Sequence, residues 1–365
     1  MNILLDNIIF SLQRTGGISV YWSELLRGLR VNNTVRLLER PEALHNIQRR
    51  ALAIQETACI RETSFLPVQI SRYLPVKPAL PPRSIFHSSY YRIACTPGVI
   101  NIVTVHDFIY ERYTGGLRRM VHSLQKGFAI RHADMIICNS EQTRQDLLHF
   151  HPDTNPDKIQ VIPMAASDEF GAVPPTTPLP SYLKELEGKP YLLYVGDRSS
   201  YKHFPVAVET VGQFPGAMLM IVGGKPLSPD ERRLLQMHIS GRYHHLHETS
   251  AAELNLLYTH AWCLLYPSAY EGFGIPPLEA MQAGCPVIAV NTASLPEVCG
   301  DAALLAAKPC AEEFVRLARL LDIPATRAAL KVAGQQRARL FSWNLTCAKT
   351  RACYEAALHR RRKKP

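Results

Sequence analysis

Short apolar runs alternate with helical patterns along most of this 365-residue chain. The runs 1–10 and 99–106 end in polar residues, as strands buried on both faces do, and residues 18–30 place their leucines near helical spacing. Further strands are predicted at 133–140 and 158–165, with a helix at 141–150 between them. Strands that alternate with helices are typical of a parallel sheet, so we predict an α/β fold.

A proline-rich segment interrupts this alternation. Four prolines lie between positions 174 and 180, where no regular element accommodates them. Beyond them the alternation restarts, with strands predicted at 190–196, 217–224, 261–267 and 286–290. A chain of this length is also too long for one ordinary core. We therefore predict a first Rossmann-like domain over 1–172, a linker over 173–190 and a second Rossmann-like domain over 191–342. Ligands would bind at the carboxyl ends of the strands, in a cleft that the two domains face.

The composition restricts the class of protein. No apolar run is long enough to span a membrane, and the N-terminus has no basic segment typical of a signal peptide. The nine cysteines form no C-x-x-C pair, which favours a reducing compartment, by default the cytoplasm. The net charge is +10, and the basic tail 359–365 contributes to it. Nucleic-acid-binding signatures are missing, so the tail is either a solvated segment or a contact with an anionic membrane surface.

The stretch "YEGFGIPPLEAMQAGCPVIAV" places Glu271 and Glu279 eight positions apart, on either side of a glycine loop and two prolines. Prolines suit the first turn of a helix, so we predict a helix over about 276–283, ended by Gly284, with Glu279 in its first turn. The glycines would leave backbone N–H groups open beside the positive end of the helix dipole, where phosphate can bind.

Two other interpretations of the glutamates are weaker. In a continuous helix they would be separated by roughly 12 Å. A glycosidase pair needs about 5 Å or about 6.5–9.5 Å, and nothing favours that pairing here. Alternatively, both glutamates only cap and solubilise the helix. Two carboxylates beside a phosphate cradle suit an elongated ligand with hydroxyls at both ends, such as a nucleotide sugar.

The wider stretch 257–305 closely resembles the E-x7-E region of the retaining glycosyltransferases of family 4 (GT4), which have the two-domain GT-B fold. The resemblance extends to most of the remaining chain. Segments similar to the family's landmarks are "RTGGISVYWSELLRGL", "VTVHDFIYERY", "IICNSEQTRQDL", "VIPMAASDEF", "YLLYVGDRSSYKHF" and "FSWNLTCAKTRACYEAAL". The last of these implies a terminal helix over about 343–358 that crosses back to the first domain.

The resemblance implies a donor site in the second domain. Glu279 would bind the donor's ribose, and Glu271 would lie near the transferred sugar. Arg198 and Lys202 would hold the diphosphate, whose negative charge grows as it departs. Either cation has a plainer alternative: Lys202 as a surface lysine, and Arg198 pointing into solvent.

Backbone groups and the first domain complete the predicted site. Gly272, Phe273 and Gly274 would present backbone to the sugar and diphosphate. Gly16 and Gly17 would let the N-terminal loop approach the phosphates. His106 would polarise or orient the sugar or the acceptor, although a structural histidine is the plainer alternative, with Asp107 orienting the loop.

Neither a metal nor a cofactor is expected. The chain has no Asp-x-Asp motif, the metal–diphosphate clamp of the other major glycosyltransferase architecture. The histidines of "HHLH" (244–247) lack metal-ligand spacing and acidic companions, so they are predicted to form a solvated loop.

The function that the resemblance implies is retaining, metal-independent transfer of a hexosyl unit, mannosyl or rhamnosyl by preference, from a nucleoside-diphosphate sugar. A GDP-sugar is favoured over a UDP-sugar. The acceptor would be a hydroxyl of a glycan or lipid-linked glycan in cell-surface polysaccharide synthesis, at the inner face of the plasma membrane. Residues 65–92 form either an acceptor-side loop or an irregular surface connection. The alternatives are a non-catalytic sugar-nucleotide-binding protein and a GT-B-fold epimerase or phosphorylase.

Overall fold

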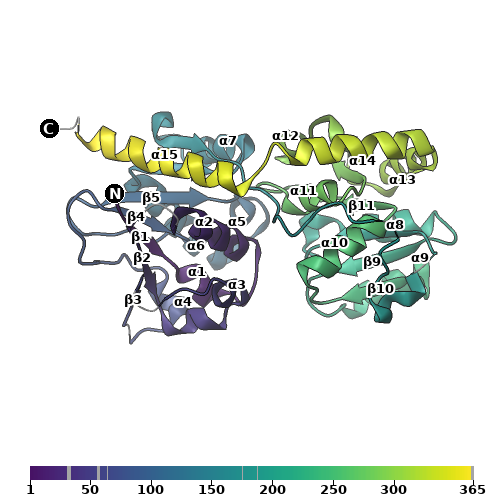
Figure 1. Cartoon of the computed structure of the whole chain (residues 1–365), viewed down its shortest axis with the longest axis horizontal. Helices are drawn as coiled ribbons and strands as arrows, with labels where there is room; N and C mark the ends of the chain where they lie inside the picture. The colour runs from purple at the N-terminus through teal and green to yellow at the C-terminus, as the bar shows by residue number, and fades with distance from the viewer. Residues whose placement is uncertain (31–33, 56–57, 64, 175, 187, 363–365) are drawn as a thin grey trace. The chain divides into compact units, whose positions relative to one another are not determined.

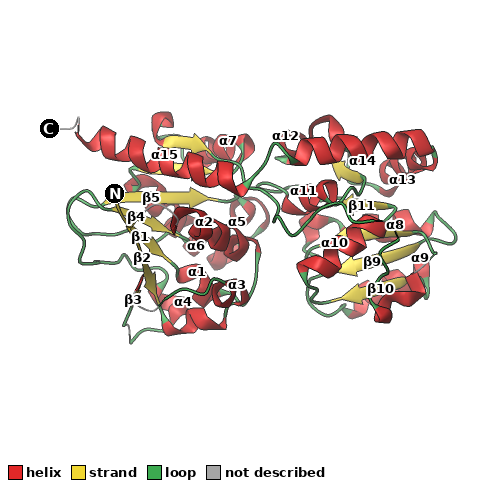
Figure 2. Cartoon of the chain, viewed as in Figure 1, coloured by secondary structure: helices red, strands yellow, loops and turns green. Residues whose placement is uncertain are grey.

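A computed structural model describes residues 1–30, 34–55, 58–63, 65–174, 176–186 and 188–362. The chain divides into two compact units. Unit 1 comprises residues 1–164 and the C-terminal segment from Trp343, and unit 2 comprises residues 165–342. Each unit contains a parallel sheet accompanied by helices (Figures 1 and 2). The predicted α/β fold with two Rossmann-like domains is confirmed.

The described strands of unit 1 form a seven-stranded parallel sheet in the order β3-β2-β1-β4-β5-β6-β7. The strands are β1 (Asn2–Asp6), β2 (Thr34–Glu39), β3 (Cys59–Arg61), β4 (Ile85–Ser88), β5 (Ile100–Val105), β6 (Met135–Cys138) and β7 (Ile159–Val161). The order reverses between β1 and β4, where Asp6 pairs in register with Ser88. Such a switch point opens a crevice at the carboxyl ends of a parallel sheet.

The helices of unit 1 include a long C-terminal one. Its described helices are α1 (Ile8–Leu12), α2 (Gly17–Arg30), α3 (Ile47–Ala51), α4 (Val68–Ser71), α5 (Ile109–Tyr113), α6 (Gly116–His132), α7 (Glu141–Phe150) and α15 (Trp343–Arg362), with short 3₁₀ turns η1 (Pro41–His45) and η3 (Pro156–Lys158). Helix α15, yellow in Figure 1, packs on α2 and beside β5 and β6. On it Tyr354 contacts the ring of His87, whose Nδ1 is 2.6 Å from the tyrosine hydroxyl.

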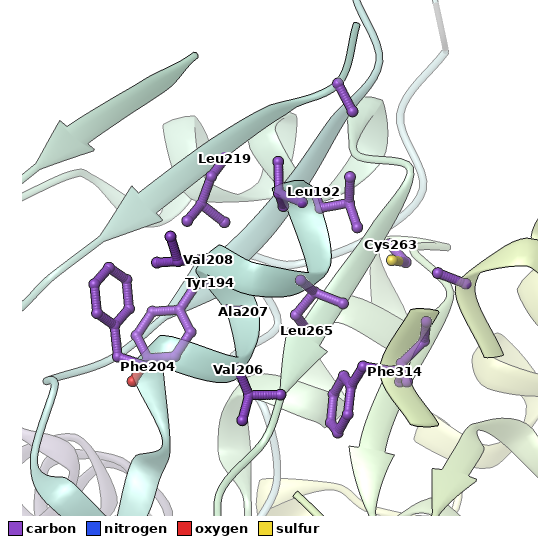
Figure 3. Close-up of a cluster of buried hydrophobic side chains, with 14 of the residues drawn as sticks. Leu192, Tyr194, Phe204, Val206, Ala207, Val208, Leu219, Cys263, Leu265 and Phe314 are labelled. Carbon is purple, nitrogen blue, oxygen red and sulfur yellow. The ribbon is translucent and has the colours of Figure 1, made fainter. Parts of the chain in front are cut away.

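The described strands of unit 2 form a six-stranded parallel sheet in the order β10-β9-β8-β11-β12-β13. The strands are β8 (Tyr191–Val195), β9 (Met218–Val222), β10 (Tyr243–Leu246), β11 (Cys263–Tyr266), β12 (Val287–Val290) and β13 (Leu304–Ala306). A buried apolar cluster joins strand residues such as Leu192, Leu219 and Leu265 to Phe204 and Phe314 from the flanking helices (Figure 3).

Seven described α-helices accompany this sheet: α8 (Phe204–Gly212), α9 (Pro229–Ile239), α10 (Ala251–His260), α11 (Ile275–Gln282), α12 (Leu295–Cys299), α13 (Ala311–Arg319) and α14 (Pro324–Ala338). The 3₁₀ turns are η4 (Ser181–Leu186), η5 (Ser200–Lys202), η6 (Gly300–Ala302) and η7 (Leu320–Asp322). Helix α9 begins with a capping box, in which the Ser228 hydroxyl accepts from the Glu231 amide and the Glu231 carboxylate accepts from the Ser228 amide.

Three predicted boundaries differ from the structure. The first strand ends at Asp6, because Ile8–Leu12 forms helix α1. The basic tail is shorter than expected, because α15 extends to Arg362, and residues 363–365 lie outside the described residues. Residues 165–172, assigned to the first domain from the sequence, belong to unit 2.

The proline-rich segment is not a free linker. It belongs to unit 2, where residues of α10 contact it: His260 Nε2 lies 2.7 Å from the Thr177 carbonyl oxygen, and Tyr182 donates to Glu253 at 2.8 Å. Leu179 and Leu183 are buried. Prolines prevent an α-helix or strand here, and hydrogen bonds of the Thr177 backbone and the Tyr182 side chain to α10 hold the segment in place.

Candidate functional site

The loop after β8 carries Lys202 to the predicted donor site. Gly196, whose φ of +131° favours glycine, follows the last strand residue Val195, and the 3₁₀ turn η5 comes next. The Lys202 ammonium lies 3.1 Å from Glu271 Oε1, and both side chains are largely buried. A Cβ at position 196 would lie 3.4 Å from that ammonium. The structure thus brings together two predicted site residues that are far apart in the sequence, and Lys202 is no ordinary surface lysine.

Ser294 fixes the glycine loop ahead of α11. Its hydroxyl lies 2.8 Å from the carbonyl oxygens of both Glu271 and Phe273. Gly274 has a φ of +106°, and a Cβ there would lie 3.0 Å from a methyl carbon of Leu295, so another residue would be strained and crowded. The Phe273 side chain is buried, which leaves only its backbone for a ligand, the role predicted for it.

Helix α11 differs in two details from its prediction. It begins at Ile275, so Glu279 lies beyond the first turn, which contains no acidic residue. Pro276 and Pro277 lie in that turn and lack N–H groups. An anion here would meet fewer amide donors than at an ordinary helix N-terminus, so the glycine loop would supply most of them. Gly284 has a φ of +75° just after the helix, as predicted.

Glu279 interacts with a tyrosine hydroxyl rather than with a cation. It is partly buried, and its Oε2 accepts a hydrogen bond from the Tyr258 hydroxyl at 3.1 Å. Burial raises the pKa of Glu279 to about 7, although the hydrogen bond acts in the opposite direction. A carboxyl group with this pKa changes charge near neutral pH, so any ligand hydroxyl that donates to it would bind in a pH-dependent way.

Arg198 does not point into solvent, and its ion-pair partner is Glu231 rather than Glu271, the partner of Lys202. Its side chain is only 4% exposed and pairs with Glu231, with Nε 2.8 Å from Oε1. Other guanidinium nitrogens donate to the carbonyl oxygens of Gly223 and Lys225 in the loop after β9. Gly224 has a φ of +75°, which favours glycine, and a Cβ there would lie 3.3 Å from the Asp197 Cα and would displace the Arg198 guanidinium. In this structure Arg198 fixes the loop between β9 and α9, and its predicted diphosphate contact would need it to leave these partners.

Two of the three histidines of the cluster belong to a strand rather than to the predicted solvated loop, and His247 lies exposed just after that strand. His244 and His245 lie in β10, and His245 Nε2 lies 2.9 Å from the Gly223 carbonyl oxygen. His247 Nδ1 similarly lies 3.2 Å from the carbonyl oxygen of Gly224. Within the described residues, no group of three or more His, Cys, Asp or Glu is arranged to hold a metal ion.

His106 lies at the carboxyl end of β5 in unit 1. Its ring packs edge-on against Tyr21 at 4.9 Å between centroids, and Asn139 donates to its carbonyl oxygen at 2.8 Å. Burial, with the nearby charge of Lys126, lowers the pKa of His106 to about 4. The imidazole is therefore neutral near pH 7 and can form a hydrogen bond, but it supplies no positive charge. Asp107 accepts from the Ile109 amide at 3.0 Å and thus shapes the loop that follows.

The N-terminal glycines are less constrained. Gly17 is the first residue of α2, and a Cβ there would meet nothing within 4 Å. At Gly16 a Cβ would clash only with the flexible end of Gln13. The structure thus gives no local packing reason for Gly17, and the predicted approach of phosphate to this loop stays a prediction.

Sequence reasoning missed the residues that hold the site in place. Tyr258 and Ser294 both fall inside the stretch 257–305 that resembles GT4 enzymes, but no motif chemistry singled them out. Glu231 could have been noticed as the last member of the S-x-x-E capping box, although this pattern does not reveal its pairing with Arg198.

Comparison with known families agrees with this geometry. The model described as "Glycosyltransferase Family 4" matches residues 15–170, and the one described as "Glycosyl transferases group 1" matches residues 180–337. Together they cover most of the chain. The chain belongs to the GT4 glycosyltransferases. Unit 1 contains most of the residues that match the Family 4 model. Unit 2 contains all residues that match the group 1 model, including Lys202, Glu271 and Glu279.

Individual relatives include mannosyltransferases. This GT4 chain is 37% identical over 141 residues to the MMP alpha-(1->4)-mannosyltransferase of Mycolicibacterium hassiacum, covering 37% of this chain and 34% of the relative. It is 28% identical over 271 residues to the O-antigen chain mannosyltransferase B of Escherichia coli, covering 70% of each. The matched stretch thus spans only a third of the first relative.

A solved structure supports the fold. HepE of Anabaena, in complex with UDP-glucose, has a TM-score of 0.71 at 14% identity and covers 96% of this chain and 99% of HepE. At this identity the likeness concerns the GT-B fold alone.

Proposed function

We propose that this glycosyltransferase moves a mannosyl or rhamnosyl unit from a nucleoside-diphosphate sugar to a hydroxyl of a glycan or lipid-linked glycan, with retention of anomeric configuration and without a metal ion. The observation that carries the proposal is the pairing of Lys202 with Glu271 at the carboxyl edge of the unit 2 sheet. A fixed cation beside a carboxylate suits a ligand with a charged diphosphate next to a sugar that bears hydroxyls.

Each end of the donor has a candidate partner. Lys202 takes up the negative charge that develops on the departing diphosphate, while the Glu271 carboxylate accepts hydrogen bonds from sugar hydroxyls. The Glu279 carboxylate accepts from the ribose hydroxyls in its ionised form. A cation provided by the protein replaces the metal ion that other enzymes use for the same charge.

Retention follows a same-face displacement in the proposed mechanism. The bond between the anomeric carbon and the diphosphate oxygen breaks first, giving an oxocarbenium-like state. The acceptor hydroxyl then attacks from the side that the diphosphate leaves, and its proton passes to a phosphate oxygen. His106, neutral at the pH of the reaction, orients a hydroxyl of the sugar or of the acceptor by a hydrogen bond.

The relatives favour the donor and acceptor classes. Two of them are named as mannosyltransferases, and one of these acts on the O-antigen chain. We therefore propose synthesis of a cell-surface polysaccharide at the inner face of the plasma membrane. The favoured donor is a GDP-sugar, in contrast to the UDP-glucose found in HepE.

A calorimetric binding panel tests the donor site. GDP-, UDP-, ADP- and dTDP-sugars are titrated in EDTA into the wild type, Lys202→Ala and the control Lys189→Ala, which removes an exposed lysine of the same unit. One nucleotide sugar is expected to bind. Loss of a charge-assisted contact should weaken it about 10- to 100-fold in Lys202→Ala and leave Lys189→Ala unchanged.

The panel also separates the alternatives. If no nucleotide sugar binds a folded sample, the donor site is misassigned. Conversion of the bound donor without any acceptor would indicate an epimerase, and orthophosphate-dependent cleavage of a glycan would indicate a phosphorylase. NMR of the product of a true transfer should show the same anomeric configuration as the donor; inversion would contradict the mechanism.

A further inference from the structure

Helix α6 (Gly116–His132) places its polar and apolar residues opposite to the usual arrangement. Its buried residues include the polar His122, Gln125 and Lys126, beside Gly127, Ala129 and Ile130 toward its C-terminal end. Its exposed face carries a stripe of large apolar side chains, Leu117, Met120, Leu124 and Phe128, which are 69%, 54%, 66% and 42% exposed. A surface helix normally turns its apolar stripe toward the core.

Polar contacts hold α6 against unit 1. Lys126, fully buried, donates to Glu111 Oε2 and to the Asp107 carbonyl oxygen, each at 2.8 Å, and lies 4.3 Å from the centre of the Phe108 ring. The ring of His122 stacks on Tyr110 at 4.0 Å between centroids. The helix is therefore anchored without its apolar stripe, and core packing does not explain why the exposed face is apolar.

The apolar stripe has neighbours of the same kind near α4. Gln125 of α6 donates to the carbonyl oxygen of Arg72 at 2.6 Å, and Arg72 caps the C-terminus of α4. The α4–α6 surface is defined here by these exposed residues: Phe65, Leu66, Ile70, Tyr73, Leu74, Leu117, Met120, Leu124 and Phe128. A soluble protein seldom exposes a large apolar patch unless something covers it.

The charged side chains within the two segments that form this surface are all basic, and the acidic Glu42 at its edge pairs with Arg40, which also donates to the Leu66 carbonyl oxygen. The sequence contains no aspartate or glutamate over residues 63–106 or 112–133, the two segments that form the surface. Arg118, Arg119 and Arg131 are exposed on α6, and Lys77 is exposed beyond α4. A second copy of the chain would set arginines against arginines. A partner that is apolar within and negatively charged at its face matches the surface better.

We propose that the α4–α6 surface docks into the headgroup region of an anionic lipid bilayer, with α6 lying in the membrane plane. At 17 residues α6 is about 25 Å long. Within the described part of the chain, no helix is long and apolar enough to cross a membrane. Apolar side chains that enter the acyl boundary and arginines that bind lipid phosphates are the two contributions by which interfacial helices bind. The proposal does not depend on which donor or acceptor the enzyme uses.

Vesicle co-sedimentation tests the surface with the full chain. Vesicles of phosphatidylcholine with about one third phosphatidylglycerol are compared with vesicles of phosphatidylcholine alone. Wild type should bind the anionic vesicles, and 0.5 M salt should weaken the binding. The double variant Leu117→Gln/Leu124→Gln should lose about tenfold or more of its partition coefficient. Met237→Gln, an equally exposed apolar residue of unit 2, is the matched control and should not change it.

A charge-matched pair separates the surface from the C-terminal tail. Arg118→Glu/Arg119→Glu and Lys363→Glu/Lys364→Glu change the net charge by the same amount. The first is expected to abolish binding, and the second to reduce it less than fivefold. Equal losses in both, or unchanged binding in Leu117→Gln/Leu124→Gln, would overturn the proposal. Sedimentation equilibrium gives a further check: a wild-type dimer that Leu117→Gln/Leu124→Gln converts to a monomer would show that a second copy covers the surface instead.

Discussion

The two units share a parallel-sheet architecture but hold their charges in different places. In unit 1, buried ion pairs lie among the strands and helices; they join Asp6 to Arg92, Glu39 to Arg49, and Glu111 to Lys126. In unit 2 the core cluster is hydrophobic, and no aspartate, glutamate, lysine or arginine among the described residues is buried as a whole residue. The Arg198 side chain, 4% exposed, pairs with the more exposed Glu231 outside that cluster. The ion pair of the candidate donor site of unit 2, Lys202 with Glu271, lies in the loops after the strands.

This difference distinguishes charged residues that stabilise the fold from charged residues that can bind a ligand. A buried ion pair that is fully hydrogen-bonded mainly fixes geometry, and removal of one partner leaves an uncompensated charge. In an ion pair at the edge of a sheet, each residue can exchange its partner for a ligand. Substitutions in unit 1 should therefore reduce stability more than donor affinity, and substitutions of the loop charges in unit 2 should do the reverse.

The largest expected effect is that the stability of the two units depends on pH in opposite directions. Burial lowers the pKa of His87 to about 3 and that of His106 to about 4, both below their unfolded value of about 6.5. The unfolded chain takes up these protons first, so the stability they contribute is present above pH 6.5 and is lost as the pH falls. Unit 1 should lose as much as about 5 kcal/mol between pH 7 and pH 4.5.

Hydrogen exchange followed by mass spectrometry can resolve the two units. Peptides from β4 and β5 should exchange faster at pH 4.5, after correction for intrinsic rates, while peptides from β11 should not. His87→Gln removes one titrating group and should remove about half of the pH dependence. Parallel behaviour of both units would contradict the assignment of the titrating groups to unit 1.

Arg92→Met breaks a buried ion pair of unit 1. It leaves Asp6 and Glu62 without their cation, because Arg92 donates to both carboxylates. The free energy of unfolding should fall by about 3–5 kcal/mol, measured by urea denaturation. Arg50→Met, at an exposed position of the same unit, should have almost no effect. Donor affinity measured below the melting transition should stay within about twofold; a parallel loss would mean that the two units do not divide stability and binding as described.

Glu279→Gln tests the carboxyl group in unit 2 whose pKa is raised. Its folded pKa of about 7 lies above its unfolded value near 4.5, so it reduces stability as the pH rises between these values. The amide removes this penalty and can still accept from Tyr258, so unit 2 should gain at most about 3 kcal/mol at pH 8 and little at pH 4.5.

The same variant should bind the donor more weakly. Wild-type affinity for the nucleotide sugar should rise from pH 6 to pH 8 as the carboxylate forms, and Glu279→Gln should remove this dependence, with a loss of about tenfold at pH 8. An intact sugar nucleotide is needed, because a free diphosphate would titrate in the same range. A pH-independent wild type would contradict the ribose contact.

The comparison also shows which features of the fold can be predicted from the sequence. Helix α2, helix α7 and strands β8, β9, β11 and β12 follow from period and composition, because buried apolar runs and amphipathic stripes record their surroundings directly. Strand β10 was mistaken for a solvated loop, and β13 was not predicted. The linker was misjudged because proline excludes regular elements but does not exclude packing, and the segment lies on α10. The exposed apolar face of α6 was missed, because the pattern of apolar residues does not say which face is covered.

The candidate site divides in the same way. The placement of Glu271 and Lys202 in one site was implied by the resemblance to GT4 enzymes, and it agrees with the rule that ligands bind at the carboxyl ends of strands. Other contacts at the site could not be predicted in this way: the pairing of Arg198 with Glu231 depends on how the loop after β8 meets the first turn of α9, and no local pattern encodes it. The raised pKa of Glu279 likewise depends on its burial in the folded unit, which the local sequence does not reveal.

The smallest expected effect concerns Arg198. Because its guanidinium fixes the loop after β9, Arg198→Ala should weaken donor binding less than fivefold, against the 10- to 100-fold expected of Lys202→Ala. Hydrogen exchange in the loop between β9 and α9 should become faster. Arg198 could support the loop or bind the diphosphate. Whether Glu231→Gln weakens or strengthens donor binding decides between these two roles. If Arg198 only supports the loop, Glu231→Gln loosens the same loop and weakens donor binding by a similar small factor. If Arg198 moves to the diphosphate when the donor binds, Glu231→Gln frees it beforehand and strengthens binding, and Arg198→Ala then costs as much affinity as Lys202→Ala.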